Sequence, residues 1–280
     1  MRMTLWIAAS LFTLYATLLA LAWAFQASLI YPAPRQAVPV PAGFAEVQLR
    51  TADGLSLRAF EHRARGGRAT IVHFHGNGGS LAGALVETQG LAEAGYGLLL
   101  VNYRGYGTNA GRPSEAGFYA DGCAAFTHLA RRGVMPGETI VMGNSIGSGT
   151  ATQMALEFAP RALILVSPFT SLTDIAAETL WFLPVRRLLR DRFDSREKIG
   201  RLSMPVLIQH GTADTLIPPA HAEALAEAAP DATLQLFDGA GHDLSFQREP
   251  QEAQVAWLAE LPEVEVSPGK LPADGRARPQ

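Results

Sequence analysis

The amino-acid sequence predicts an α/β fold, in which a mostly parallel β-sheet is flanked by helices and preceded by one N-terminal transmembrane helix. Continuous apolar runs recur along the chain, and longer segments with helical periodicity separate them. Strands buried on both faces have this pattern, so the alternation indicates a parallel sheet between two helical layers. The expected strands are residues 70–74, 97–101, 139–142, 162–166, 206–208 and 233–237, and the expected helices are 80–94, 115–131, 148–158 and 219–228.

Two short runs of alternating apolar and polar residues, 44–50 and 55–61, come before these strands. The turn sequence Ala52-Asp53-Gly54 joins them, so we expect an antiparallel hairpin at the start of the sheet.

Composition narrows the class of protein. The chain has 280 residues, of which 48% are hydrophobic and 18% charged, and this suits one large α/β domain. Its formal net charge of −3 gives no reason to expect nucleic acid as a partner. The single cysteine, Cys123, excludes an internal disulfide and a cysteine-based metal cluster.

The N-terminal segment predicts a membrane anchor. Residues 5–25 are mostly apolar, and no charged residue occurs between positions 3 and 34. A helix needs about 20 such residues to span a bilayer. The alternative is a cleavable signal peptide, since Ala20-Leu21-Ala22 resembles a cleavage site, but signal peptides usually have a shorter apolar region of about 7–15 residues. We therefore expect an uncleaved anchor over residues 1–30. Arg2 precedes the span, which favours a single-pass protein with its folded domain outside the cytoplasm, in the periplasm if the source is bacterial.

The remaining chain divides into two parts. Residues 31–261 are expected to form one domain, with a short flap at about 168–203. Residues 262–280 contain four prolines and little apolar content, so they are expected to be a disordered tail.

A G-x-S-x-G motif lies where the strand at 139–142 turns into the next helix. It consists of Gly143, Ser145 and Gly147. A serine at such a sharp turn is raised above the sheet edge, and the flanking glycines let strand and helix approach closely. Ser145 is therefore the candidate nucleophile.

Two further loops complete a catalytic triad in the order Ser, Asp, His. Asp214 follows the strand at 206–208, and His242 follows the strand at 233–237. A histidine can take the proton of the serine hydroxyl, and an aspartate can orient and stabilise the imidazole. Asp174, Asp194 and Asp243 are rival acids, but their positions suit helix caps and loops.

Two backbone N–H groups are expected to form an oxyanion hole. One belongs to Ile146, directly after the nucleophile, and the other to Asn77 in a glycine-rich loop after the strand at 70–74. His73 and His75 share one face of that strand, but no third ligand is spaced to complete a metal site. No dinucleotide-binding or Walker A motif is present. We predict neither a cofactor nor a metal.

Several motifs together resemble the α/β-hydrolase family, and within it the membrane-anchored Bem46-like serine hydrolases. They are His75-Gly76-Asn77-Gly78-Gly79, Arg104-Gly105-Tyr106-Gly107, Gly111-Arg112-Pro113-Ser114-Glu115, Gly143-Asn144-Ser145-Ile146-Gly147, Asp214 with Pro218-Pro219-Ala220-His221, and Gly241-His242. The resemblance implies an α/β-hydrolase fold and a cofactor-free hydrolase of carboxylic esters or thioesters, and some relatives act on acylated lipids or proteins. The chain departs from the usual pattern at Asn109 and at Gly147-Ser148-Gly149.

The substrate is expected to meet the glycine-rich loop and the flap. The candidate binding residues are His75, Gly76, Tyr106, Trp181 and Phe182. Seven basic and three acidic residues occupy positions 186–201 of the flap. They predict an ordinary amphipathic helix or, alternatively, a surface that faces lipid headgroups with Trp181 and Phe182 near the acyl chains.

These observations predict a membrane-anchored serine esterase or thioesterase that works through an acyl-enzyme on Ser145. Its expected substrate is an acyl ester or thioester, lipid-like substrates included. A peptidase or an acyltransferase on the same triad, and a catalytically silent membrane scaffold, are the alternatives. Oligomeric state cannot be deduced from the sequence.

Overall fold

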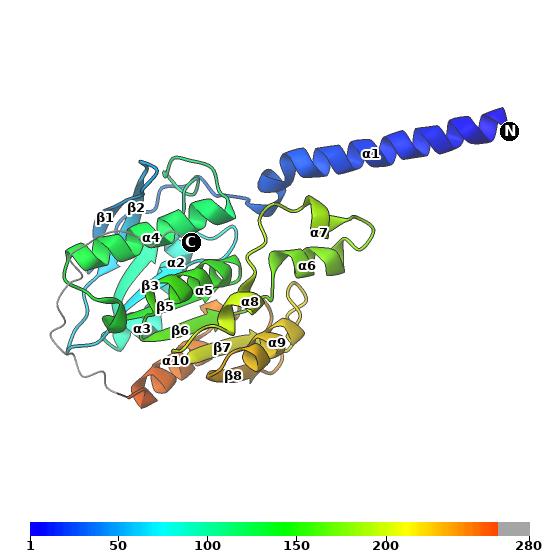
Figure 1. Ribbon diagram of the computed structural model, residues 1–280. Coiled ribbons are helices and arrows are strands. Elements are labelled where there is room, and N and C mark those ends of the chain that lie inside the picture. Colours follow the sequence, from blue (N-terminus) through cyan, green and yellow to red (C-terminus); the bar gives the residue numbers. More distant parts are fainter. Residues whose placement is uncertain (263–280) are drawn as a thin grey trace.

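The computed structural model describes residues 1–262, so the predicted tail, apart from Pro262, lies outside the described residues. One eight-stranded sheet forms the centre of the molecule, in the order β1-β2-β4-β3-β5-β6-β7-β8 (Figure 1). The strands are β1 (Ala45–Arg50), β2 (Ser56–His62), β3 (Thr70–Phe74), β4 (Gly97–Val101), β5 (Thr139–Asn144), β6 (Ala162–Val166), β7 (Val206–Gly211) and β8 (Ala232–Phe237).

Strand direction agrees with the sequence pattern. The alternating runs form the β1–β2 hairpin, which pairs antiparallel with β4. The continuous apolar runs form the parallel part from β4 to β8. The α/β-hydrolase fold predicted from sequence is thus confirmed.

Helices cover both faces of the sheet, and α1 projects away from it (Figure 1). They are α1 (Arg2–Ile30), α2 (Leu81–Glu87), α3 (Gln89–Glu93), α4 (Glu115–Arg131), α5 (Ile146–Phe158), α6 (Leu172–Thr179), α7 (Val185–Leu188), α8 (Ser195–Ile199), α9 (Ala220–Ala228) and α10 (Arg248–Glu260). The helix predicted at 80–94 is two helices, because the chain turns at Thr88, whose hydroxyl donates to the Ala84 carbonyl at 2.7 Å.

The two faces of the sheet carry separate apolar cores. In β4, Leu99 and Val101 join the core that includes residues of α4 and α5, while Leu98 and Leu100 join the core that includes residues of α2 and α10. This alternation follows from the two-residue period of a strand.

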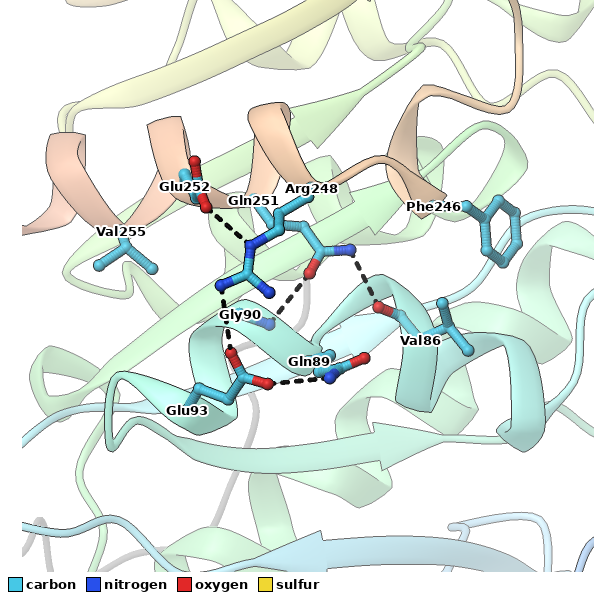
Figure 2. Close-up of a pocket in the computed structure, with 9 residues that line it drawn as sticks. All are labelled: Val86, Gln89, Gly90, Glu93, Phe246, Arg248, Gln251, Glu252 and Val255. Atoms are coloured by element: carbon cyan, nitrogen blue, oxygen red, sulfur yellow. Dashed lines mark hydrogen bonds and ion pairs between the residues drawn. The ribbon is translucent and has the colours of Figure 1, made fainter.

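A cleft of about 280 Å³ lies between α3 and α10, on the face of the sheet that α2 and α10 cover (Figure 2). Gln251 crosses it, accepting from the Gly90 N–H at 3.0 Å and donating to the Val86 carbonyl at 2.9 Å. Arg248 pairs with Glu252 at 2.8 Å. The two bonds of Gln251 therefore hold α10 against α2 and α3.

Helix α1 is long and apolar enough to cross a membrane. It lies outside both cores except at its C-terminal end, where Gln26 and the following Tyr31 are buried. The elements α6 and α7 of the flap lie beside it in Figure 1.

Arg104 holds the loop after β4, through acidic partners on two sides. The buried Asp121 accepts from its backbone N–H at 2.9 Å and from Nε at 2.8 Å, and the half-exposed Asp53 pairs with Nη1 at 2.7 Å. Burial raises the pKa of Asp121 to about 6, against the opposing effect of Arg104, whereas the hydrogen bond from Arg104 lowers the pKa of Asp53 to about 2.

Replacing Asp121 is therefore expected to cost much more stability than replacing Asp53. Asp121→Ala leaves a guanidinium without its buried partner, and we predict a loss of about 3–5 kcal/mol in the free energy of unfolding. Asp53→Ala removes an exposed partner and should cost about 1 kcal/mol or less. Urea denaturation measures both. Equal losses for the two variants would contradict this assignment.

Candidate active site

Ser145 occupies a strained turn between β5 and α5. Its backbone has φ 51° and ψ −120°, a conformation that residues with a side chain rarely adopt. Its N–H donates to the Val166 carbonyl of β6 at 2.9 Å. A Cβ on Gly147 would collide with the Phe74 carbonyl, and a Cβ on Gly143 with the Gly147 carbonyl. Glycine is therefore required at both flanks, as the motif indicated.

The three residues predicted as a triad lie in one chain of hydrogen bonds. His242 Nε2 is 3.0 Å from Ser145 Oγ, and His242 Nδ1 is 2.8 Å from Asp214 Oδ2. Ser145 is 8% exposed and Asp214 is 4% exposed, while 27% of the His242 side chain reaches solvent. Ser145, His242 and Asp214 are thus within the distances needed for proton transfer.

The Asp214 carboxylate has donors on both of its oxygens. Oδ1 accepts from the backbone N–H groups of Leu216 and Ile217, each at 2.9 Å. On the other side, His210 Nε2 lies 3.3 Å from Oδ2 and 2.8 Å from the Ile217 carbonyl. Because both neighbours of this nitrogen are acceptors, it carries the proton.

His210 is a residue of the site that sequence reasoning missed. Burial lowers its pKa, so its neutral form is favoured. Its position four residues before Asp214, at the carboxyl end of a strand, was the available signal.

The rival acids have other roles. Asp194 accepts from the Glu197 N–H at 3.3 Å and caps α8, and Asp174 pairs with Arg186 at 2.9 Å in the flap. Asp243 is exposed next to His242.

The loop after β3 lies close to the Ser145 side chain. A Cβ on Gly76 would lie 3.5 Å from Cβ of Ser145, and Asn77 follows directly. The Asn77 side chain is held on two sides, since Oδ1 accepts from the Tyr106 hydroxyl at 3.0 Å and Nδ2 donates to the Ile30 carbonyl at 2.5 Å. Ile146 is the first residue of α5, where a helix leaves its N–H groups free of intrahelical partners.

Two of the expected substrate contacts are buried. His75 and Tyr106 have no exposed surface and pack against each other behind the loop after β3. His75 packs edge-on against Tyr103 and bonds to Asn102 Oδ1 at 3.2 Å. The sequence pattern did not indicate this burial, because burial of a strand-end side chain depends on its neighbours in space.

Trp181 and Phe182 lie in the loop between α6 and α7. They are 81% and 50% exposed, and the Phe182 carbonyl accepts from the Tyr15 hydroxyl of α1 at 3.1 Å. The tip of the flap therefore contacts the middle of α1.

A second group that the sequence did not reveal lies behind the turn. Asn144 donates to Ser245 Oγ at 2.9 Å and to Glu87 Oε1 at 3.3 Å, and Glu87 Oε2 lies 2.9 Å from His73 Nε2. Burial alone would raise the pKa of Glu87, but the contact with His73 outweighs it and holds that pKa low. The sequence signal for this buried group was Glu87 itself, a glutamate on the apolar face of α2. Within residues 1–262, no cluster of His, Cys, Asp and Glu is arranged to hold a metal ion.

Comparison with known proteins places the chain in a family. A model of the alpha/beta hydrolase fold matches residues 69–195, and a model of the serine aminopeptidase S33 group matches residues 185–250. The uncharacterized protein Rv2307c of Mycobacterium tuberculosis is 36% identical over 230 residues, which cover 79% of this chain and 82% of that protein. Alpha/beta hydrolase domain-containing protein 17C of Xenopus tropicalis is 36% identical over 182 residues, which cover 64% of this chain and 57% of the relative.

Solved structures share the fold. The esterase Pf2001 of Pyrococcus furiosus aligns with a TM-score of 0.66 at 19% identity, covering 82% of this chain and 99% of the esterase. Est1E of Butyrivibrio proteoclasticus, solved with ferulic acid, aligns with a TM-score of 0.66 at 18% identity and covers 77% and 98% of the two chains. The chain belongs to the α/β-hydrolase superfamily.

Proposed function

We propose that the protein is a serine esterase or thioesterase that forms an acyl-enzyme on Ser145. The observation that carries this proposal is the continuous hydrogen-bonded chain from Ser145 Oγ through His242 to Asp214, at 3.0 and 2.8 Å. The strained turn presents the hydroxyl to this chain, and the loop at Gly76 approaches the Cβ of the same serine. The narrower Bem46-like grouping remains a prediction from sequence.

The proposed reaction has two steps. Ser145 Oγ attacks the acyl carbon while His242 Nε2 takes its proton, and Asp214 stabilises the imidazolium. The negative oxygen that forms accepts hydrogen bonds from the N–H groups of Ile146 and Asn77. His242 then protonates the departing alcohol or thiol, leaving the acyl group on Ser145. In the second step His242 takes a proton from water, which attacks the acyl carbon. The carboxylic acid product leaves, and His242 returns the proton to Ser145 Oγ.

A peptidase is the second candidate, because the model of the serine aminopeptidase S33 group matches residues 185–250. The esterase proposal is preferred because the flap contains only the short helices α6, α7 and α8, without a large domain to select peptide ends. Hydrolysis of aminoacyl p-nitroanilides faster than of p-nitrophenyl esters would favour the peptidase.

We also propose that α1 crosses a membrane and holds the folded domain on its extracytoplasmic side. The length and apolar character of α1 support the span. Fractionation of the full-length protein, followed by protease treatment of intact cells, tests both the span and the side.

Loss of the nucleophile or the base is expected to abolish covalent chemistry. Ser145→Ala and His242→Ala should each lower kcat/KM for a p-nitrophenyl ester by about a thousandfold or more, and both should lose labelling by a fluorophosphonate. Asp243→Ala is the matched control, because this exposed acid adjoins His242 and should leave labelling unchanged. Labelling that persists in Ser145→Ala would assign the nucleophile to another residue.

His210 is expected to act as a positioning residue for Asp214. His210→Ala removes one donor from the buried carboxylate, so we predict that kcat falls about tenfold while KM changes little. His210→Gln can offer an N–H to the same oxygen and should recover part of kcat. His128→Ala controls for general destabilisation, because it removes a different histidine, one that pairs with Glu61 and not with Asp214. A KM effect with kcat unchanged would rule out the positioning role.

A further inference from the structure

An apolar cavity lies between the C-terminal half of α1 and the flap. Its volume is about 230 Å³, and residues of both elements form its wall. Gln26 is the one polar member of that wall. The lining residues are Ala22, Gln26, Leu29, Ile30, Leu172, Ala176, Leu180, Leu183, Val185, Leu188 and Leu189.

Gln26 does not make the cavity polar, because its amide is already satisfied. Nε2 donates to the Trp23 carbonyl at 2.9 Å and to the Leu188 carbonyl at 3.3 Å, and Oε1 accepts from the Arg190 N–H at 2.9 Å. A buried amide with these partners has no need of a water or a polar ligand. The space therefore suits an aliphatic group.

The cavity adjoins the segments that surround Ser145. The carbonyl of Ile30, in the cavity wall, accepts a hydrogen bond from the side chain of Asn77. Asn77 directly follows Gly76, which lies beside Ser145 in space. Leu172, on the opposite wall, begins α6 six residues after Val166, whose carbonyl binds the Ser145 N–H. The segments that form the cavity wall are thus bonded to, or directly continue from, the segments that hold the Ser145 turn.

Contacts along α1 set the depth of the flap relative to the helix. The Phe182 carbonyl meets Tyr15, and the guanidinium of Arg190 lies 3.9 Å from the ring centre of Trp23. Tyr15 and Trp23 are separated by about 12 Å along a helix. With α1 across a bilayer, the apolar tip of the flap lies at the middle of the span and Arg190 lies nearer the domain. The apolar tip would then lie at the depth of the lipid hydrocarbon, and Arg190 closer to the lipid headgroups.

We propose that this cavity binds one fatty acyl chain of the substrate, and that the membrane helix α1 forms a wall of the acyl site. The inference rests on the proposed esterase function and identifies its substrate class as long-chain acyl esters or thioesters. A volume below the roughly 300–1,000 Å³ of sites that enclose a whole small molecule suits a single chain. Leu29 and Leu180, which are 72% and 37% exposed, leave the wall open toward the lipid.

Tryptophan substitutions that fill the cavity test this proposal in the full-length protein in detergent. Ala22→Trp fills it from α1, and Ala176→Trp fills it from α6. Ala24→Trp and Ala177→Trp are matched controls, because these alanines lie on the same helices outside the cavity wall. The quantity measured is the ratio of kcat/KM for p-nitrophenyl palmitate to kcat/KM for p-nitrophenyl butyrate. This ratio does not depend on the fraction of each preparation that is folded.

The ratio is expected to fall at least tenfold in both cavity variants and to stay within twofold of wild type in both controls. A ratio unchanged in Ala22→Trp would overturn the role of α1, and a ratio unchanged in both variants would overturn the acyl site, while hydrolysis of the esters by wild type would leave the proposed function standing. If wild type cleaves neither ester, the proposed function fails and this inference fails with it.

The acyl chain has two natural sources, a lipid ester and an acylated cysteine. Replacing the palmitoyl reagent by phosphatidylcholine vesicles or by an S-palmitoyl peptide distinguishes them. The cavity variants should slow cleavage of whichever substrate the wild type accepts, and the controls should not. Equal rates for cavity variants and controls would count against the acyl site.

Discussion

The close approach of α5 to the loop after β3 is the constraint on which the site depends. Gly147 leaves no room for a side chain against the Phe74 carbonyl, and this contact forces the sharp turn at Ser145. The strain at φ 51° persists because the turn is fixed on both sides, by the Ser145 N–H bond to β6 and by packing against β3. The Ser145 hydroxyl is thereby held in a fixed position.

Parallel strands then bring the other groups to the same edge. Asp214 follows β7 and His242 follows β8, and both lie beyond the carboxyl ends of their strands. The sheet therefore supplies the orientation that the hydrogen-bonded chain needs, and the donors around Asp214 hold the acid still. Rigid elements of this kind give a catalytic group its geometry at little cost during the reaction.

Much of the fold, and the meeting of Ser145, Asp214 and His242 at one edge of the sheet, could be predicted from sequence, because they depend on local patterns. The continuous apolar runs identified the parallel strands, and Gly143 and Gly147 identified the turn. Other features depend on contacts between distant segments and were not predictable. His75 proved to be buried because Tyr103 and Tyr106 pack around it. The contact of His210 with Asp214 is different, because it is local, and the spacing of four residues could have predicted it. The packing of the flap on α1 rests on Gln26 and Arg190, which lie far apart in the chain.

Acylation of Ser145 can be observed by rapid acid quenching followed by peptide mass spectrometry. After brief reaction of the full-length protein with p-nitrophenyl butyrate, we expect a butyryl group on the peptide that contains Ser145, and its loss as substrate is exhausted. A butyryl group on a different residue, or turnover of the ester without any acylated peptide, would show that Ser145 is not the nucleophile.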